Sequence, residues 1–182
     1  MTVYVLPANL PVPVDDGAAD HLAGTRVPAL TLESSVGPID LAAFGAGRGV
    51  LYVYPRTGRP DREVPETWDS IPGARGCTPE SCGFRDHTEE LRALGAKVAG
   101  LSSQTLEEQV ELSQRLGILH PVLSDPELEL RDALSLPTFE FEGQTLYKRL
   151  TLVLERGAIA KVFYPVFPPD RHAEEVLAWL GS

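Results

Sequence analysis

The sequence predicts an α/β protein with a mixed central sheet flanked by helices. Short apolar runs such as Val50–Tyr54 alternate with longer stretches whose apolar residues recur at helical spacing. The resulting order, β-α-β-α-β-α-β-β-α, is typical of a mixed sheet with helices on both faces. With 182 residues, of which 43% are hydrophobic, the chain is long enough to form one domain with a proper core.

Seven stretches have the composition of strands. They cover residues 29–32, 38–41, 50–54, 97–101, 121–123, 150–155 and 158–164. The first two flank Ser34–Gly37 and the last two flank Arg156–Gly157, so each pair is predicted to form a hairpin. Val50–Tyr54 is continuously apolar, which is expected of a strand buried on both faces.

Five stretches carry helix start and stop signals. They cover residues 41–44 and about 79–94, 106–116, 126–134 and 170–180. Their predicted capping residues are Asp40, Thr78, Thr105, Asp125 and Asp170. Thr78 precedes Pro79, which suits the first helical position because proline has no N–H to lose there. Thr105 and Glu108 form a capping box, and Gly95 and Gly117 end the second and third helices.

Two segments have no regular pattern. Residues 1–26 are rich in Pro, Ala, Asp and Gly, and we expect an irregular arm there, followed by a single domain over residues 27–182. Residues 56–75 form a long connection that contains three prolines. Loops of this length inside a compact domain are usually functional or disordered. Trp68 predicts that the loop folds back and partly covers the site that follows it, and the alternative is a tolerated surface insertion.

The only two cysteines, Cys77 and Cys82, lie at the start of the helix that follows this loop. The free N–H groups and the dipole of a helix N-terminus stabilise a thiolate, so we expect the pKa of Cys77 to fall below its usual value of about 8.5. In an intact helix the two Cα atoms would lie about 8.7 Å apart, whereas a disulfide needs less than about 7 Å. A disulfide between them therefore requires the first turns to unwind, which Gly76 and Gly83 make easier.

Composition and charge exclude several classes of function. The net charge of −10 argues against nucleic acid or an anionic membrane as a partner. No apolar stretch reaches the ~18 residues of a membrane span. The N-terminus has no basic region and its apolar run stops at Pro7, so a cytoplasmic location is expected. Cys77, Cys82 and His87 have a spacing of five and five without a fourth ligand nearby, so we expect no metal site.

The cysteine segment resembles a known family. Tyr54-Pro55 after an apolar strand, then Gly76-Cys77-Thr78, Cys82 and Phe84-Arg85-Asp86 resemble the bacterioferritin-comigratory (Q-type) group of the two-cysteine peroxiredoxins. The resemblance extends from about Val27 to the C-terminus. It implies a thioredoxin-like fold with a peroxiredoxin-type N-terminal extension. The chain departs from the family at Ala74, where the family has a threonine, and over residues 56–70, where the family has a short turn.

The resemblance also implies an activity, a thiol-dependent reduction of hydrogen peroxide or small organic hydroperoxides without a cofactor. Cys77 would attack the peroxide and become a sulfenic acid, and Cys82 would resolve it as a disulfide. A thioredoxin-type protein would then reduce that disulfide. The protein would be a monomer or a weak homodimer. The alternative function is a redox sensor or disulfide relay with little peroxidase turnover, which Ala74 favours.

The resemblance assigns further residues to this site. Arg149, which precedes the apolar strand 150–155, matches the family's arginine that approaches the reactive sulfur. Pro55, Gly76 and Thr78 support the site. Arg75 either adds a cation near Cys77 or is a solvated loop arginine. The missing threonine hydroxyl leaves two alternatives, weak activity or replacement by a hydroxyl of the inserted loop, from Thr57, Thr67 or Ser70.

Overall fold

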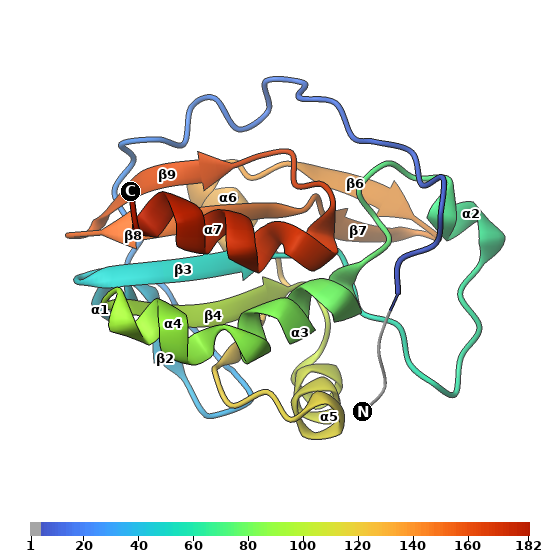
Figure 1. The fold of residues 1–182 in the computed structure, drawn as a ribbon, viewed down its shortest axis with the longest axis horizontal. Coiled ribbons are helices and arrows are strands. Elements are labelled where there is room, and N and C mark those ends of the chain that lie inside the picture. The colour runs from blue at the N-terminus through green and yellow to red at the C-terminus, as the bar shows by residue number, and fades with distance from the viewer. Residues whose placement is uncertain (1–4) are drawn as a thin grey trace.

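A mixed five-stranded sheet with helices on both faces forms the centre of the molecule, as predicted (Figure 1). The computed structural model describes residues 5–182. In spatial order the strands are β5 (Val122–Ser124), β4 (Ala96–Ser102), β3 (Arg48–Val53), β8 (Leu150–Glu155) and β9 (Ala158–Phe163). The strands β3, β4 and β5 are parallel, whereas β8 runs antiparallel to β3 and β9 antiparallel to β8.

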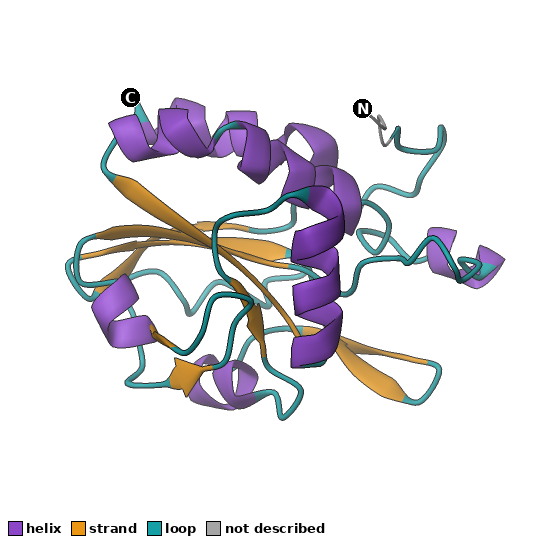
Figure 2. Ribbon diagram, turned by 90° about the horizontal axis from the view of Figure 1, so that it is seen from below, coloured by secondary structure: helices purple, strands orange, loops and turns teal. Residues whose placement is uncertain are grey.

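The helices divide between the two faces of the sheet (Figure 2). One face packs against α3 (Cys77–Asp86), α4 (Thr88–Ala93), α5 (Leu106–Leu116) and α7 (His172–Leu180), and the other against α1 (Leu41–Phe44) and α6 (Glu129–Leu134). Successive residues of β3 enter the two cores alternately: Val50 and Tyr52 belong to the first core, and Leu51 and Val53 to the second. The strand is therefore buried on both faces, as its apolar run predicts.

The antiparallel register of β3 and β8 positions the functional end of the sheet. Val53, the last residue of β3, pairs with Leu150, the first residue of β8. At the other end Arg48 pairs with Glu155, and their side chains form an ion pair of 2.6 Å. The register thus places residue 149 beside the C-terminal end of β3, where the chain leaves for the long loop and the cysteine helix.

Two of the five predicted caps are confirmed, those of α1 and α5. The Asp40 carboxylate accepts hydrogen bonds from the first turn of α1, and Thr105 and Glu108 form both bonds of the capping box of α5. Asp125 accepts from Glu129 N at 2.8 Å and from Leu130 N at 3.0 Å. The N-cap position of α6 is nevertheless Leu128, so Asp125 bonds to the first turn from a loop position and the helix begins at Glu129 rather than directly after Pro126. Asp170, the predicted cap of the last helix, lies inside a 3-10 turn, and the N-cap of α7 is Arg171.

The predicted start of the cysteine helix is wrong by two residues. The N-cap of α3 is Gly76 and its first residue is Cys77, so Thr78 lies inside the first turn and does not cap the helix. Gly76 has a φ of 114°, and a Cβ there would collide with the ring of Pro169. Only glycine combines this left-handed conformation with such a close approach. The helix therefore begins at the glycine, even though Thr78 is the better capping side chain.

The predicted helix over residues 79–94 is divided into α3 and α4 at His87. His87 has φ −103° and ψ 12°, which is outside the helical range. The Thr88 hydroxyl donates to the carbonyls of Phe84 and Arg85 at 2.9 and 3.0 Å. Such local side-chain bonds compete with the backbone ladder and favour a break there.

Several elements are absent from the prediction. They are the hairpin β6 (Thr138–Phe141) and β7 (Gln144–Tyr147), the short α2 (Glu66–Asp69), and a 3-10 turn, η1 (Pro169–Arg171), at the start of the last helix. The hairpin turns at Glu142 and Gly143, both with positive φ, and such a pair with glycine second is a recognisable hairpin signal. The predicted first hairpin exists as β1 (Thr31–Leu32) and β2 (Ile39–Asp40).

The first part of the described chain follows the edge of the sheet without forming a strand of its own (Figure 1). Gly24 N donates to Ile159 O, and Ile159 N donates to Thr25 O, both at 2.8 Å. Leu22 is fully buried in the core that also contains Leu51. Residues 1–4 of the predicted arm lie outside the described residues.

A buried histidine gives the fold a pH-dependent stability. His120 is 7% exposed, its Nε2 shares a 2.7 Å hydrogen bond with the Tyr52 hydroxyl, and burial lowers its pKa to about 4. In the unfolded chain histidine titrates near 6.5. Between these values the unfolded chain binds a proton that the folded chain does not, so the free energy of unfolding falls as the pH is lowered.

We predict that the free energy of unfolding falls between pH 7 and pH 4 in the wild type by up to about 3 kcal/mol more than it falls in His120→Gln. Glutamine offers Tyr52 a polar partner but does not titrate. Urea denaturation of both proteins at several pH values measures the difference. Parallel losses in the two proteins would contradict this role of His120.

Candidate active site

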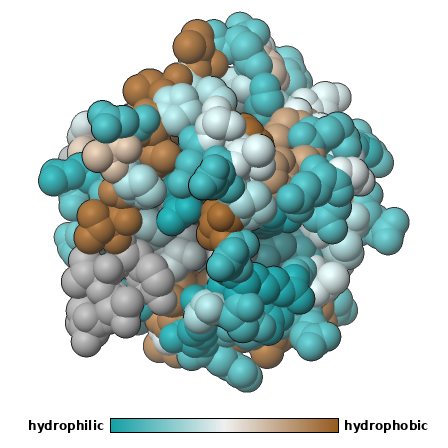
Figure 3. Space-filling model, turned by 90° about the vertical axis from the view of Figure 1, so that its right-hand side faces the viewer, coloured by the Kyte–Doolittle hydropathy of each residue, from teal (hydrophilic) through white to brown (hydrophobic). Residues whose placement is uncertain are grey.

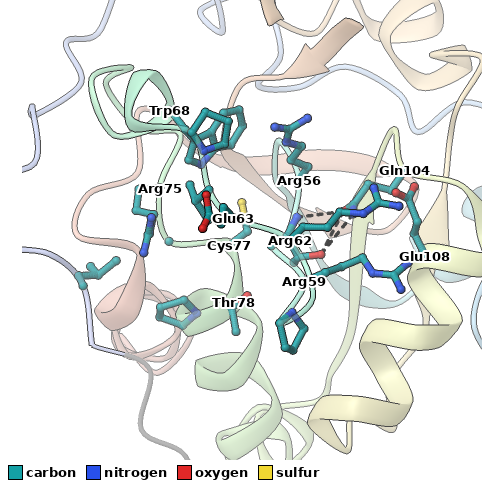
Figure 4. Close-up of a pocket in the computed structure, with 18 of the residues that line it drawn as sticks. Arg56, Arg59, Arg62, Glu63, Trp68, Arg75, Cys77, Thr78, Gln104 and Glu108 are labelled. Carbon is teal, nitrogen blue, oxygen red and sulfur yellow. Dashed lines mark hydrogen bonds between the residues drawn. The ribbon is translucent and has the colours of Figure 1, made fainter. Parts of the chain in front are cut away.

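The Cys77 thiol lies at the base of a cleft of about 780 Å³ at the carboxyl end of the parallel strands (Figure 4). Ligands of open α/β sheets usually bind at this end. Cys77 is the first residue of α3 and is 3% exposed. Its Sγ accepts a hydrogen bond of 3.1 Å from Nη2 of Arg149. The structure thus brings together two predicted site residues that lie 72 positions apart.

The Arg149 guanidinium is held on all sides. It is buried, and it donates to the carbonyls of Gly73 at 3.2 Å and Ala74 at 3.0 Å, and more loosely to that of Arg75 at 3.4 Å. Its Nη1 donates to the carboxylate of Glu80, which is completely buried. Charge-assisted bonds of this kind fix a guanidinium in one orientation. The backbone that directly precedes the cysteine therefore positions the arginine that contacts the sulfur.

The pKa of the Cys77 thiol is raised, and the prediction of a lowered pKa is wrong for this geometry. Burial is the main cause, and the negative charge of Glu80 acts in the same direction. The Arg149 guanidinium and the backbone N–H of Arg56 lower this pKa but do not offset the burial. The prediction from the helix N-terminus does not include the loss of solvation at a residue as buried as Cys77, and this loss disfavours the thiolate.

Glu80 is absent from the predicted site residues, although its position is visible in the sequence. It follows Cys77 by three residues, so both side chains lie on the same face of α3. The sequence does not show the register of the sheet, and it is this register that brings Arg149 next to both Cys77 and Glu80. Oε1 of Glu80 has no hydrogen-bond partner among the described residues, and burial raises the pKa of this carboxyl group.

Cys82 lies five residues after Cys77 in the same unbroken helix, and both cysteines are free thiols. The geometry of an intact helix separates their Cα atoms by about 8.7 Å, which is too far for a disulfide. Cys82 is half-buried, and burial raises the pKa of its thiol. The neighbouring Arg85 pairs with Asp86 at 2.8 Å, and it also donates to the carbonyl of Leu116 at the end of α5.

The other predicted site residues occupy different positions around the cysteine. Gly76 and Thr78 line the cleft next to Cys77, whereas Pro55 is buried where β3 ends. Arg75 also lines the cleft, but its guanidinium forms an ion pair of 3.0 Å with Asp69. Its charge is therefore matched by a carboxylate of the same loop, and it does not contact the sulfur as Arg149 does.

The long loop folds back over the site, which confirms the prediction made from Trp68. This side chain is 4% exposed, lines the cleft, and packs edge-on against Phe141 of β6 at 4.9 Å. The Arg56 guanidinium lies over the same indole ring at 4.8 Å. The hairpin β6–β7 therefore anchors the loop, and this contact is invisible in the sequence because the hairpin itself is not predicted.

Ala74 lies in an apolar environment and brings no hydroxyl to the site. Its side chain belongs to the small core of Trp68 and Phe141, and its carbonyl is the group that faces Arg149. Of the three candidate hydroxyl residues, Thr57 is buried and lines the cleft. Thr67 and Ser70 are exposed, and the Ser70 hydroxyl donates to the Thr67 carbonyl.

Two kinds of feature are not found among the described residues. Within residues 5–182, no cluster of three or more His, Cys, Asp or Glu side chains has the arrangement of a metal site. Over the same residues, no helix is long and apolar enough to span a membrane.

Comparison with known proteins agrees with this geometry. The redoxin family model matches residues 22–177. The chloroplastic peroxiredoxin Q of Sedum lineare is 29% identical over 161 residues, which cover 87% of this chain and 77% of that protein. The crystal structure of peroxidoxin BcpB from Mycobacterium tuberculosis superposes with a TM-score of 0.71 at 25% identity, covering 88% of this chain and 96% of the other.

The bacterioferritin comigratory protein of Xanthomonas campestris, whose structures address its alkyl peroxide reduction activity, has a TM-score of 0.69 at 26% identity. The match covers 87% of this chain and 97% of that one. These neighbours are peroxiredoxins with a thioredoxin-like fold. The family match spans most of the described chain, and the cleft is lined by a cysteine whose sulfur accepts a hydrogen bond from a buried arginine. The chain therefore belongs to the redoxin family and is a Q-type peroxiredoxin, a thiol-dependent peroxidase.

Proposed function

We propose that this peroxiredoxin reduces hydrogen peroxide and small organic hydroperoxides through Cys77, with Cys82 as the resolving thiol. The observation that carries the proposal is the 3.1 Å contact between Cys77 Sγ and Arg149 at the base of the cleft. The alkyl peroxide reduction activity named for the Xanthomonas campestris relative supports the inclusion of organic hydroperoxides.

In the first step the Cys77 thiolate attacks the nearer peroxide oxygen. An S–O bond forms, the O–O bond breaks, and the leaving oxygen takes up a proton and departs as water or an alcohol. The sulfur is oxidised by two electrons to a sulfenic acid and the peroxide is reduced. Arg149 donates to the sulfur and favours the thiolate over the thiol.

In the second step the Cys82 thiol condenses with the sulfenic acid, which forms an S–S bond and releases water. Both residues lie in the intact α3, so its first turns unwind before the sulfur atoms meet. A dithiol protein of the thioredoxin type then reduces the disulfide and returns both thiols.

Thr57 supplies the hydroxyl that the family carries on its threonine. Its Oγ1 and both polar ends of the Gln104 amide are within 3.3 Å, so the amide holds the hydroxyl in place. Thr57 follows Arg56, whose backbone N–H acts on the Cys77 sulfur. The hydroxyl therefore lies on the wall of the cleft that a peroxide entering toward Cys77 passes.

We predict that Cys77→Ser abolishes peroxide consumption and that Cys82→Ser stops after about one turnover, because its sulfenic acid has no resolving thiol. Thioredoxin-coupled consumption of hydrogen peroxide measures both. Mass spectrometry of the oxidised wild type should show an internal Cys77–Cys82 disulfide, and dimedone should label Cys77 in Cys82→Ser. Sustained thioredoxin-coupled turnover by Cys82→Ser would remove Cys82 from the resolving role.

Thr57→Val should lower kcat/KM for hydrogen peroxide about 10²-fold, the usual effect of removing one preorganised donor. Stopped-flow oxidation of the reduced protein gives this rate without interference from the reductant. Thr67→Val serves as the matched control, because Thr67 is exposed and does not line the cleft. Equal rates in the two variants would show that the Thr57 hydroxyl takes no part.

The raised pKa of Cys77 predicts a rate that increases with pH above neutrality, because only the thiolate reacts. Glu80→Gln removes a negative charge that raises this pKa, so the profile should move to lower pH. Alkylation of the thiol by iodoacetamide, followed from pH 5 to 10, measures the shift. A profile that stays in place or moves to higher pH would contradict the role of the Glu80 charge.

A further inference from the structure

We infer that the cleft above Cys77 is built for organic hydroperoxides that carry a carboxylate, and that Arg56 and Arg62 bind this anionic group. The inference rests on the proposed reduction of hydroperoxides at Cys77. It adds a charge preference that neither the family match nor the reaction itself requires, because hydrogen peroxide is neutral.

Arginine side chains gather at this one cleft. Five of them line it: Arg56, Arg59, Arg62, Arg75 and Arg115. The first four are labelled in Figure 4. All except Arg115 belong to the inserted loop. The chain as a whole has a net charge of −10 and repels an anion at long range. An anionic substrate must therefore be bound locally, by guanidinium groups of the cleft that have no close carboxylate partner.

Three of these five charges are balanced by neighbouring carboxylates. Each forms an ion pair of 3.0 Å or less, and the pairs are Arg59–Asp61, Arg75–Asp69 and Arg115–Glu111. Their donors are directed at protein groups, so they shape the wall of the cleft.

Arg56 and Arg62 differ from these three. The Arg56 guanidinium lies over the rings of Trp68 and Phe141 at 4.8 and 5.0 Å, which fixes its orientation, and its nearest carboxylate, that of Glu142, is 3.9 Å away. Arg62 is exposed and forms no ion pair with the residues that the structure describes. An incoming carboxylate can therefore take bonds from both without breaking a close ion pair.

Carboxylates also line the cleft and must be weighed against these cations. They belong to Glu63, Glu108 and Glu142. The Glu108 carboxylate accepts from Thr105 in the capping box of α5, and Glu142 is exposed opposite Arg56. Glu63 is exposed and adjoins Arg62 in the chain. Because Asp61, Asp69 and Glu111 pair with three of the five guanidinium groups, the cleft has no excess of positive charge. Among the described residues, Arg56 and Arg62 are the two lining arginines without a close ion pair, and they are the ones left to bind an anion.

The remaining wall is apolar and suits an organic body between the anionic group and the hydroperoxide. It contains Leu6, Pro60, Val64, Pro65 and Trp68. On this side of the molecule, apolar and hydrophilic surfaces lie side by side (Figure 3). Among the described residues, the lining includes Cys77 but not Cys82. A molecule bound here therefore reaches the thiol that is oxidised, which favours the hydroperoxide over the reductant as the anionic ligand.

Cumene hydroperoxide and its para-carboxylate form a matched pair that tests the charge preference. Stopped-flow oxidation of the reduced protein gives a second-order rate constant for each, and the ratio of carboxylate to neutral substrate is the readout. We expect a ratio of about ten in the wild type. Arg56→Gln and Arg62→Gln should each lower it about threefold to fivefold. Sodium chloride at 0.5 M should lower it as well, because these charges are partly exposed.

Arg92→Gln is the matched control, since this arginine is exposed on α4 outside the cleft and should leave the ratio within twofold of the wild type. A wild-type ratio of one or less, or a ratio that neither cleft variant changes, would overturn the inference while the peroxidase proposal stands. Failure of the wild type to react with any hydroperoxide would instead overturn the proposed function. Turnover with mercaptosuccinate and with mercaptoethanol completes the test. An effect of the variants confined to the anionic thiol would assign the arginines to the reductant and refute the inference.

Discussion

The contact between Arg149 and Cys77 is the interaction on which the rest of the site depends. It joins the start of β8 to the start of α3, and Glu80 completes it from the next turn of the same helix. All three side chains are buried, so each charge depends on the others for compensation. Removing one partner of such a group leaves an uncompensated buried charge, which is strongly destabilising. Reactivity and local stability are therefore coupled in the same few atoms.

Within this group of side chains, opposing effects act on the pKa of the Cys77 thiol. Burial and Glu80 raise the pKa of Cys77, while Arg149 and a backbone N–H from the loop lower it. The closed, reduced conformation thus holds the thiol in a dry environment with a cation already in contact. Preorganised donors of this kind favour the charge that develops during reaction and need no rearrangement at that moment. Glu80 Oε1, which has no hydrogen-bond partner among the described residues, lies in the same buried group.

The inserted loop is part of the site and more than a surface addition. Trp68 packs on the β6–β7 hairpin, and the small apolar core that results also takes up the side chain of Ala74. A hydroxyl at that position would be buried among aromatic rings, at a cost in free energy. The same loop brings Thr57 and four arginines to the cleft. The site thus lacks the hydroxyl of the family's threonine at Ala74, and the same loop supplies the Thr57 hydroxyl and four guanidinium groups.

Local sequence patterns predict the α/β class, the order of most elements, the two-sided burial of β3, and the identity of the cysteine pair. These features depend on local periodicity, on capping residues and on the position of glycine, all of which act over a few residues. Arg149 as a site residue came from family resemblance and not from local pattern. The prediction that Thr78 caps the cysteine helix is wrong. Gly76 is the N-cap because of its left-handed backbone conformation and its close contact with Pro169, and capping preferences read from neighbouring residues do not include that contact.

The environment of the sulfur depends on contacts between segments that are distant in the sequence. The direction of the pKa shift, the roles open to Glu80 and Thr57, and the arginine-lined cleft depend on which distant segments meet at the end of the sheet. The β3–β8 register and the packing of Trp68 of the loop against Phe141 determine which of these segments come into contact. Desolvation and Coulomb interactions depend on the residues that lie close in space. The chemistry of Cys77 therefore follows from tertiary packing, which local sequence patterns do not reveal.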